Sequence, residues 1–84
     1  MGASNMGFGN AIAKLHGGLR VQRAGWNGKG MFLFLINEWT YTDGKQDNYQ
    51  NLPFIAMKTA DDKVVPWLAS QTDILAEDWN TVEN

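Results

Sequence analysis

The stretch Met31-Phe32-Leu33-Phe34-Leu35-Ile36 decides the fold of this 84-residue chain. It places six apolar residues in succession, without the polar alternation of a strand that has one face in water. Such a run is typical of a β-strand that is buried on both faces. We therefore expect a sheet whose two sides must both be covered.

The segment before this strand predicts one amphipathic helix. Its apolar residues recur at i, i+3, i+4 and i+7, which puts them on one stripe of a helix. These positions are Phe8, Ala11, Ile12 and Leu15. Asn5 is the predicted cap at the start of the helix, and Gly17-Gly18 is predicted to end it.

Four further segments are predicted to be short strands. They are Leu19 to Ala24, Pro53 to Lys58, Lys63 to Trp67 and Trp79 to Val82. In the first of them Leu19 and Val21 share a face, and Arg23 points the same way if the alternation holds without a bulge, so this arginine needs a partner. Asp61-Asp62 suits a tight hairpin turn, Asp43 to Asn51 is expected to be a polar loop, and Ser70 to Glu77 is expected to begin with a cap and continue as a helical turn or two. The predicted fold class is therefore α+β, with an N-terminal helix packed on an antiparallel sheet of about five strands and a short helical turn before the last strand.

The length predicts one domain, over residues 6–84, and an association between copies. Residues 1–5 are expected to be a flexible leader, left from cloning or frayed, because Met6 can serve as the natural start. A chain of 84 residues without cysteine has no disulfide to supplement a small core. One short helix covers one face of the sheet, so we expect the other face to meet a second copy of the chain.

Charge and hydropathy exclude several classes of partner. Seven Lys and Arg stand against nine Asp and Glu, so the net charge of -2 provides no basic excess for polymeric nucleic acid. No apolar run approaches the roughly 20 residues of a membrane helix, and the N-terminus lacks the layout of a secretory signal. We expect a cytoplasmic protein without a membrane partner.

Residues that could carry catalysis or hold a metal are few. The single histidine, His16, lies near a predicted helix end and has no second ligand at i+4. Asp73, Glu77 and Asp78 could form an acid–base cluster, but helix capping and a solvated face explain them better. We expect no enzyme, no metal and no cofactor.

Two segments that each place a tryptophan beside polar donors predict a pocket for a small nucleotide. An indole is a flat surface for a purine, and arginine, lysine, glycine N–H groups and helix N-termini are donors for phosphate oxygens. The candidate residues are Arg23, Trp26, Asn27, Gly28, Lys29, Trp67, Ser70, Gln71, Thr72 and Asp73. The alternative is structural: both tryptophans belong to the core, Asn27-Gly28 is only a turn, and Ser70 or Thr72 is only a cap.

Long ordered motifs in these segments resemble a known family. They are Phe8-Gly9 with Ala11-Ile12, Arg23 to Met31, Met57 to Asp61, and Val65 to Asp73 with Leu75 to Trp79. Over Phe8 to Val82 the chain resembles the second type of Thoeris anti-defence protein, a family of small phage and prophage proteins. The middle, Asn37 to Leu52, departs from the Pro-containing loop that is usual in that family.

The resemblance implies a molecular sponge. Members bind, without a reaction, a cyclic ADP-ribose isomer that bacterial TIR-domain enzymes make from NAD, and so keep it from the effector it activates. They are homotetramers with pockets between protomers, and some also hold cyclic oligonucleotides at separate sites. The departure over Asn37 to Leu52 leaves the ligand preference and any second site open.

Carried onto this chain, the resemblance assigns roles within the two segments. Trp26 and Trp67 would stack on or enclose the adenine and ribose. Asn27, Gly28 and Lys29 would contact phosphates or sugar hydroxyls, while Arg23 and Ser70 to Asp73 would support them or act from a neighbouring protomer. The alternatives are a sponge for cyclic di- or trinucleotides, an enzyme that modifies such a signal, or a purely structural or inhibitory subunit.

Overall fold

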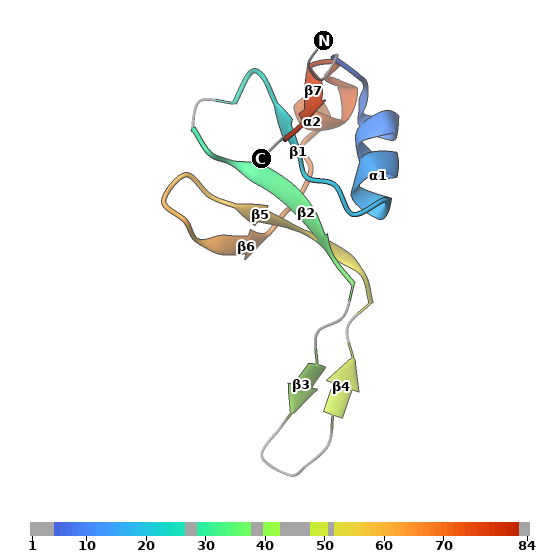
Figure 1. The fold of residues 1–84 in the computed structure, drawn as a ribbon, viewed down its shortest axis with the longest axis vertical. Helices are drawn as coiled ribbons and strands as arrows, with labels where there is room; N and C mark the ends of the chain where they lie inside the picture. The colour runs from blue at the N-terminus through green and yellow to red at the C-terminus, as the bar shows by residue number, and fades with distance from the viewer. Residues whose placement is uncertain (1–4, 27–28, 38–39, 43–47, 51, 83–84) are drawn as a thin grey trace.

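A computed structural model describes residues 5–26, 29–37, 40–42, 48–50 and 52–82 of the chain. These residues form two helices and seven strands (Figure 1). In chain order the elements are α1 (Phe8–His16), β1 (Val21–Arg23), β2 (Phe32–Ile36), β3 (Thr40–Thr42), β4 (Asn48–Gln50), β5 (Phe54–Lys58), β6 (Val64–Pro66), α2 (Gln71–Leu75) and β7 (Trp79–Thr81).

The main sheet has five antiparallel strands in the order β6-β5-β2-β1-β7. The apolar strand β2 lies at its centre, where it pairs with β5 along its whole length, from Phe32 opposite Lys58 to Ile36 opposite Phe54. Each of the five predicted strand segments contains one strand of this sheet. The predicted α+β class is confirmed, including the short helix before the last strand.

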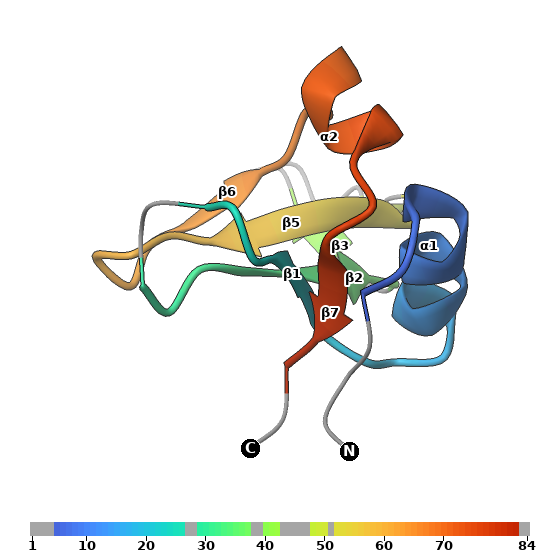
Figure 2. The same cartoon turned by 90° about the horizontal axis from the view of Figure 1, so that it is seen from above.

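The core lies between α1 and one face of the sheet. Val21 pairs with Leu33 in the register of β1 and β2, so both side chains point to this face. The fully buried members of the cluster are Ala11, Leu15, Val21, Leu33 and Trp79. Helix α1 packs against β7 and contacts α2 (Figure 2). Met6, just before α1, pairs with Trp79 in β7, so both ends of the fold meet at this edge strand of the sheet.

The opposite face of the sheet carries aromatic residues. Phe32 and Phe34 alternate with Leu33 and therefore point away from α1, with their ring centroids 6.1 Å apart. The Arg20 guanidinium lies 4.8 Å from the Phe32 centroid. Of the five residues of β2, only Leu33 is fully buried in a single chain, and the others are half-buried. The expected cover by a second copy stays a prediction.

The predicted cap at Asn5 is wrong. The residue at the N-cap is Gly7, without a side-chain cap. Met6 instead forms a bridge to Trp79, with each backbone N–H donating to the other carbonyl at 3.0 Å. This extended pairing prevents the helix from starting at residue 6. The predicted end is confirmed, because Gly17 is the C-cap and Gly18 adopts a φ of 87°, which glycine accepts readily.

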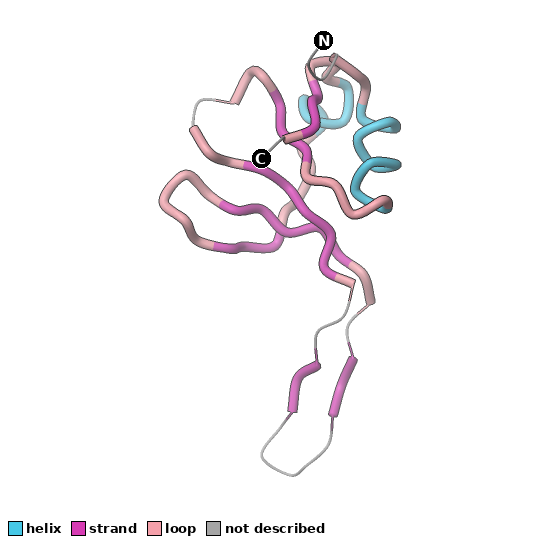
Figure 3. The backbone as a smooth tube through the Cα atoms, in the orientation of Figure 1, coloured by secondary structure: helices cyan, strands magenta, loops and turns pink. Residues whose placement is uncertain are grey.

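The predicted polar loop over Asp43 to Asn51 is wrong for residues 48–50. These residues form β4, which pairs antiparallel with β3 so that Tyr41 lies opposite Tyr49. Tyrosine and threonine favour strands, and the partner that satisfies their backbone lies on the other side of the loop. Figures 1 and 3 show this second hairpin extending away from the five-stranded sheet.

The predicted turn between β5 and β6 is confirmed. Asp62 has a φ of 66°, its N–H donates to the Thr59 carbonyl at 3.0 Å, and the Thr59 N–H donates to the Lys63 carbonyl at 2.7 Å. Pro66 ends β6, the edge strand of the sheet, as its missing N–H requires.

Candidate ligand-binding site

Three tryptophans and a phenylalanine form one aromatic cluster. Trp79 is its centre and is fully buried. Trp26 and Trp67 each present an edge to it, with ring centroids 5.5 Å and 6.0 Å away and interplanar angles of 80° and 86°. Phe8 lies 5.5 Å from Trp79 and 6.1 Å from Trp67. The structure thus brings together the two candidate stacking residues, one from each sequence segment.

Trp26 and Trp67 belong partly to the core and partly to the surface. Both pack against the buried cluster, yet both are only half-buried. Each indole is therefore held by the core and still partly reaches the surface. A role in the core and a role in ligand binding are therefore compatible for these residues. A stacking surface that is already held in place loses little conformational entropy when a ligand binds.

Arg23 connects the two candidate segments through ion pairs. Its Nη1 donates to Asp73 Oδ1 at 2.8 Å, and its Nε donates to Asp78 Oδ1 at 2.8 Å. All three side chains are largely shielded, with exposed fractions of 16%, 15% and 29% for Arg23, Asp73 and Asp78. The alternation of the first strand placed Arg23 on the face of Val21, where a cation needs a partner, and these two carboxylates are that partner.

Arg23, Asp73 and Asp78 form an ion-paired triad, and the contacts within it stabilise the charged form of each side chain. The hydrogen bonds that Arg23 donates to Asp78 and Asp73 raise the pKa of Arg23. The Arg23 guanidinium lowers the pKa of Asp78, with help from the Gly25 N–H. Burial opposes the ionised form of Asp73, but hydrogen bonds from Arg23, Ser70 and the Trp26 indole outweigh it and lower its pKa. One guanidinium between two carboxylates leaves the triad with one negative charge, so it does not attract phosphate.

The N-terminus of α2 is a closed capping box. Ser70 Oγ accepts from the Asp73 N–H at 3.1 Å, and the Asp73 carboxylate accepts from the Ser70 N–H at 3.3 Å. The structure therefore gives Ser70 and Asp73 the capping role that the sequence left open as an alternative. Gln71 and Thr72 are exposed in the first turn of α2.

The glycine-rich turn is described only in part. Asn27 and Gly28 lie outside the described residues. Lys29 is exposed just before β2 and forms no ion pair with a residue that the structure describes. It is therefore a cation whose charge the described residues leave uncompensated.

Two residues that the sequence reasoning did not place at this site belong to its framework. Trp79 was predicted only as the start of a strand, yet its indole Nε1 donates to the Asp73 carbonyl at 3.0 Å and its ring supports both other tryptophans. Gly25 donates its N–H to Asp78 Oδ2 at 2.8 Å. The signal in the sequence for this set of contacts is Arg23, an arginine that alternation places on the apolar face of a strand.

The described residues contain neither a metal-binding cluster nor a membrane-spanning helix. Groups of three or more His, Cys, Asp or Glu that could hold a metal ion do not occur in the described part of the chain. Within the same residues, neither helix has the length and hydropathy to cross a bilayer.

Comparison with known proteins places the chain in a family. Residues 6–82 match the Thoeris anti-defense 2-like domain. The chain is also similar to the protein named Thoeris anti-defense 2 of Bacillus phage SP01, with 44% identity over 88 aligned positions that cover 94% of this chain and 97% of the phage protein. On both grounds, the chain belongs to the Thoeris anti-defense 2-like family.

Proposed function

We propose that this protein counteracts Thoeris defence by sequestering a cyclic ADP-ribose isomer made by TIR-domain enzymes. It would act in the cytoplasm of the bacterial host, as a non-covalent sponge. The family supports the anti-Thoeris role. The observation that carries the choice of ligand is the pair of half-buried indoles, Trp26 and Trp67, held edge-on against Trp79.

These indoles supply the binding energy for the base. Stacking of a nucleobase on an aromatic side chain contributes about 1–3 kcal/mol. Because Trp26 and Trp67 already pack against the core, little side-chain freedom remains to be lost when a base binds. In this proposal the adenine stacks on one indole, and the other encloses the ribose.

The phosphates would lie away from the ion-paired triad. Arg23 is already neutralised by Asp73 and Asp78, which agrees with its supporting role. Lys29 is exposed next to the glycine-rich turn, and we propose that it and the neighbouring Asn27 and Gly28 hold the diphosphate. Gln71 and Thr72 are exposed on α2, and we propose that their side chains bind sugar hydroxyls.

We further propose that the pocket is completed between copies in a homotetramer. Large apolar side chains near the candidate site are open in a single chain: Leu68 is 91% exposed and Leu75 is 75% exposed. The aromatic face of β2 is also only half-buried. Burying these surfaces between copies would stabilise a small domain and shield a bound ligand from water.

The state of Asp73 favours binding over catalysis. A general base works best when its pKa lies near the working pH, whereas contacts with Arg23 and Ser70 lower the pKa of Asp73 and occupy its oxygens. A carboxylate in this state serves as a structural acceptor.

Calorimetry with purified cyclic ADP-ribose isomers tests the proposal. We expect saturable heat at micromolar protein and recovery of the isomer unchanged after the complex is heated. A panel of cyclic di- and trinucleotides should fail to displace it. Absence of heat with every isomer, preferential binding of a cyclic oligonucleotide, or a modified ligand would each overturn the proposal in a distinguishable way.

Two variants locate the site. Lys29→Gln should weaken binding, while Lys14→Gln, which removes an equally exposed charge from α1, should leave it unchanged. Equal weakening by both variants would indicate a general electrostatic effect and would count against the assigned phosphate site.

A further inference from the structure

We infer that Arg23 is a positioning residue that fixes the turn carrying Trp26 and thereby sets the orientation of that indole. As a statement about ligand affinity, the inference rests on the proposed function. As a statement about the orientation of Trp26, it stands on the geometry alone.

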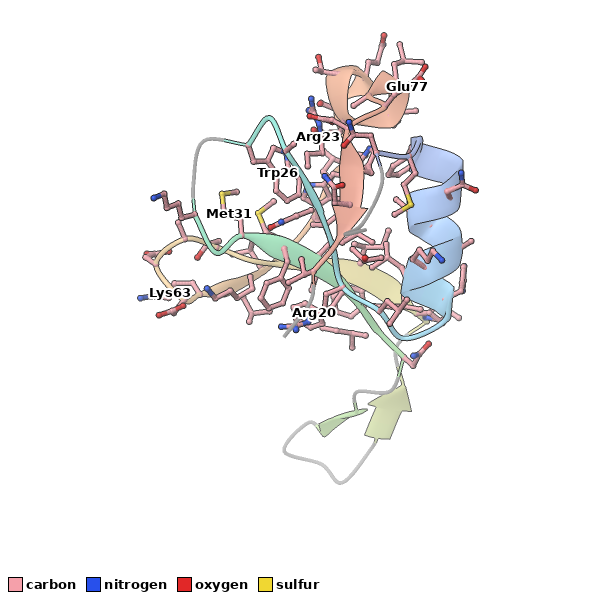
Figure 4. All side chains as sticks on the ribbon, turned by 45° about the horizontal axis from the view of Figure 1, so that its top comes forward. Arg20, Arg23, Trp26, Met31, Lys63 and Glu77 are labelled. Carbon is pink, nitrogen blue, oxygen red and sulfur yellow. The ribbon has the colours of Figure 1, made fainter. Side chains whose placement is uncertain are left out.

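Three segments that are distant in the sequence meet at the Arg23 guanidinium. It extends from the end of β1 to Asp73 on α2 and to Asp78 in the connection to β7, at separations of 50 and 55 residues (Figure 4). Both hydrogen bonds measure 2.8 Å and use different guanidinium nitrogens. A planar group held at two points has a defined orientation, which a single contact would not give.

Asp78 extends this constraint to the backbone that leads to Trp26. Its carboxylate accepts from the Gly25 N–H at 2.8 Å, and its carbonyl accepts from the Ala24 N–H at 3.0 Å. The Trp26 N–H then closes the turn by donating to the Arg23 carbonyl at 3.3 Å. Three successive N–H groups are thus satisfied by Asp78 and Arg23.

The backbone of the turn packs closely against the Arg23–Asp78 ion pair. A Cβ on residue 25 would lie 3.0 Å from Asp78 Oδ2 and 3.5 Å from Arg23 Nη2. The backbone at Gly25 is therefore pressed against the ion pair, and the ion pair determines where the next residue, Trp26, leaves the turn.

Asp73 connects the same guanidinium to the Trp79 indole. Its carboxylate binds Arg23, while its carbonyl accepts from Trp79 Nε1 at 3.0 Å. A shift of Arg23 would consequently change the relation of Trp26 to Trp79, although Arg23 itself stacks on neither ring among the contacts of the described residues.

The experiment compares Arg23→Lys and Asp78→Asn with Lys63→Gln. A lysine ammonium cannot reproduce the two-point contact, and asparagine keeps the acceptor for Gly25 but loses the charge. Lys63→Gln is the matched control, because it removes the same charge from an exposed pair, 4.0 Å from Asp61, at the β5–β6 hairpin (Figure 4).

The first readout is the indole N–H resonance of each tryptophan in ¹⁵N-labelled protein without ligand. We expect Arg23→Lys to shift or broaden the Trp26 signal more strongly than the Trp79 signal, which comes from a fully buried ring whose N–H is held by a backbone carbonyl. Asp78→Asn should shift the Trp26 signal by a smaller amount, and Lys63→Gln should shift neither. The second readout is affinity for the cyclic ADP-ribose isomer that the unaltered protein binds best, which should fall roughly tenfold in Arg23→Lys, a partial loss of the stacking energy.

The outcomes separate this inference from the proposed function. An unchanged Trp26 signal in Arg23→Lys overturns the positioning role, and lost affinity with that unchanged signal would assign Arg23 to direct ligand contact. If all tryptophan signals disappear in both Arg23→Lys and Asp78→Asn, the triad stabilises the whole fold and does not specifically orient Trp26, which also overturns the inference. If the unaltered protein binds no isomer, the proposed function fails, and the resonance data alone decide the positioning role.

Discussion

Trp26 stands edge-on to Trp79, with 5.5 Å between the ring centroids and 80° between the ring planes. This is a favoured arrangement of aromatic rings, because the positive edge of one ring meets the negative face of the other. The contact joins a turn residue to the fully buried centre of the core. A residue that is a candidate for ligand stacking is therefore also held by the framework of the fold, and the two roles can be separated by substitution.

Trp26→Ala should abolish stacking, whereas Trp26→Phe should retain part of it. Loss of one stacked base weakens binding by about 1–3 kcal/mol, or roughly 5- to 150-fold in Kd. Titration calorimetry of both variants with the best-binding cyclic ADP-ribose isomer measures the difference. Leu52→Ala, at a side chain that is 84% exposed just before β5, is the control. Equal affinity of Trp26→Ala and the unaltered protein would exclude Trp26 from the site.

Leu33→Ala should strongly destabilise the fold. Leu33 is fully buried in the central strand, so its truncation leaves a cavity that costs about 2–5 kcal/mol in the free energy of unfolding. Leu52→Ala makes the same chemical change at a side chain that is 84% exposed and should cost less than about 0.5 kcal/mol. Urea unfolding followed by circular dichroism compares the two. A similar cost at both positions would contradict the assignment of the core.

Gly25→Ala should destabilise the protein and weaken binding. The added Cβ would lie 3.0 Å from Asp78 Oδ2, so the ion pair or the turn must shift. Gly9→Ala is the matched control in α1, where a Cβ has nothing within 4 Å. That control should stabilise the helix by about 0.5–1 kcal/mol, because alanine loses less backbone entropy than glycine. Melting temperatures that move in the same direction in both variants would argue against a crowded turn at Gly25.

The triad predicts a loss of stability in acid. The folded-state pKa values of Asp73 and Asp78 are lowered, so their contribution is fully present above the unfolded-state value of about 4. It should decline as the pH falls below that value and through the folded-state pKa values, because the unfolded chain takes up protons first. Urea unfolding between pH 7 and pH 3 measures this slope, and Asp78→Asn should reduce it. An equal slope in Asp78→Asn and in the unaltered protein would contradict this prediction.

Local patterns in the sequence identified most of the elements. The spacing of Phe8 and Leu15 is confirmed as α1, the apolar run is confirmed as the central strand β2, and Asp61-Asp62 is confirmed as a hairpin turn. These elements depend on side-chain periodicity and on turn preferences, which act between residues a few positions apart. The cap at Asn5 and the polar loop over residues 48–50 were wrong because distant partners, Trp79 and β3, organise those residues.

At the candidate site, the sequence determined the residue types, and the tertiary structure decided how they are used. Sequence alone indicated tryptophans beside polar donors and an arginine that required a partner. Only the fold brought Asp73 and Asp78 to Arg23 across 50 and 55 residues, assigned Ser70 to a cap, and placed Trp79 beneath both other indoles. The physical reason is the range of the interactions. Helix periodicity and turns depend on neighbouring residues, whereas ion pairing and aromatic packing depend on which distant segments the folded sheet brings together.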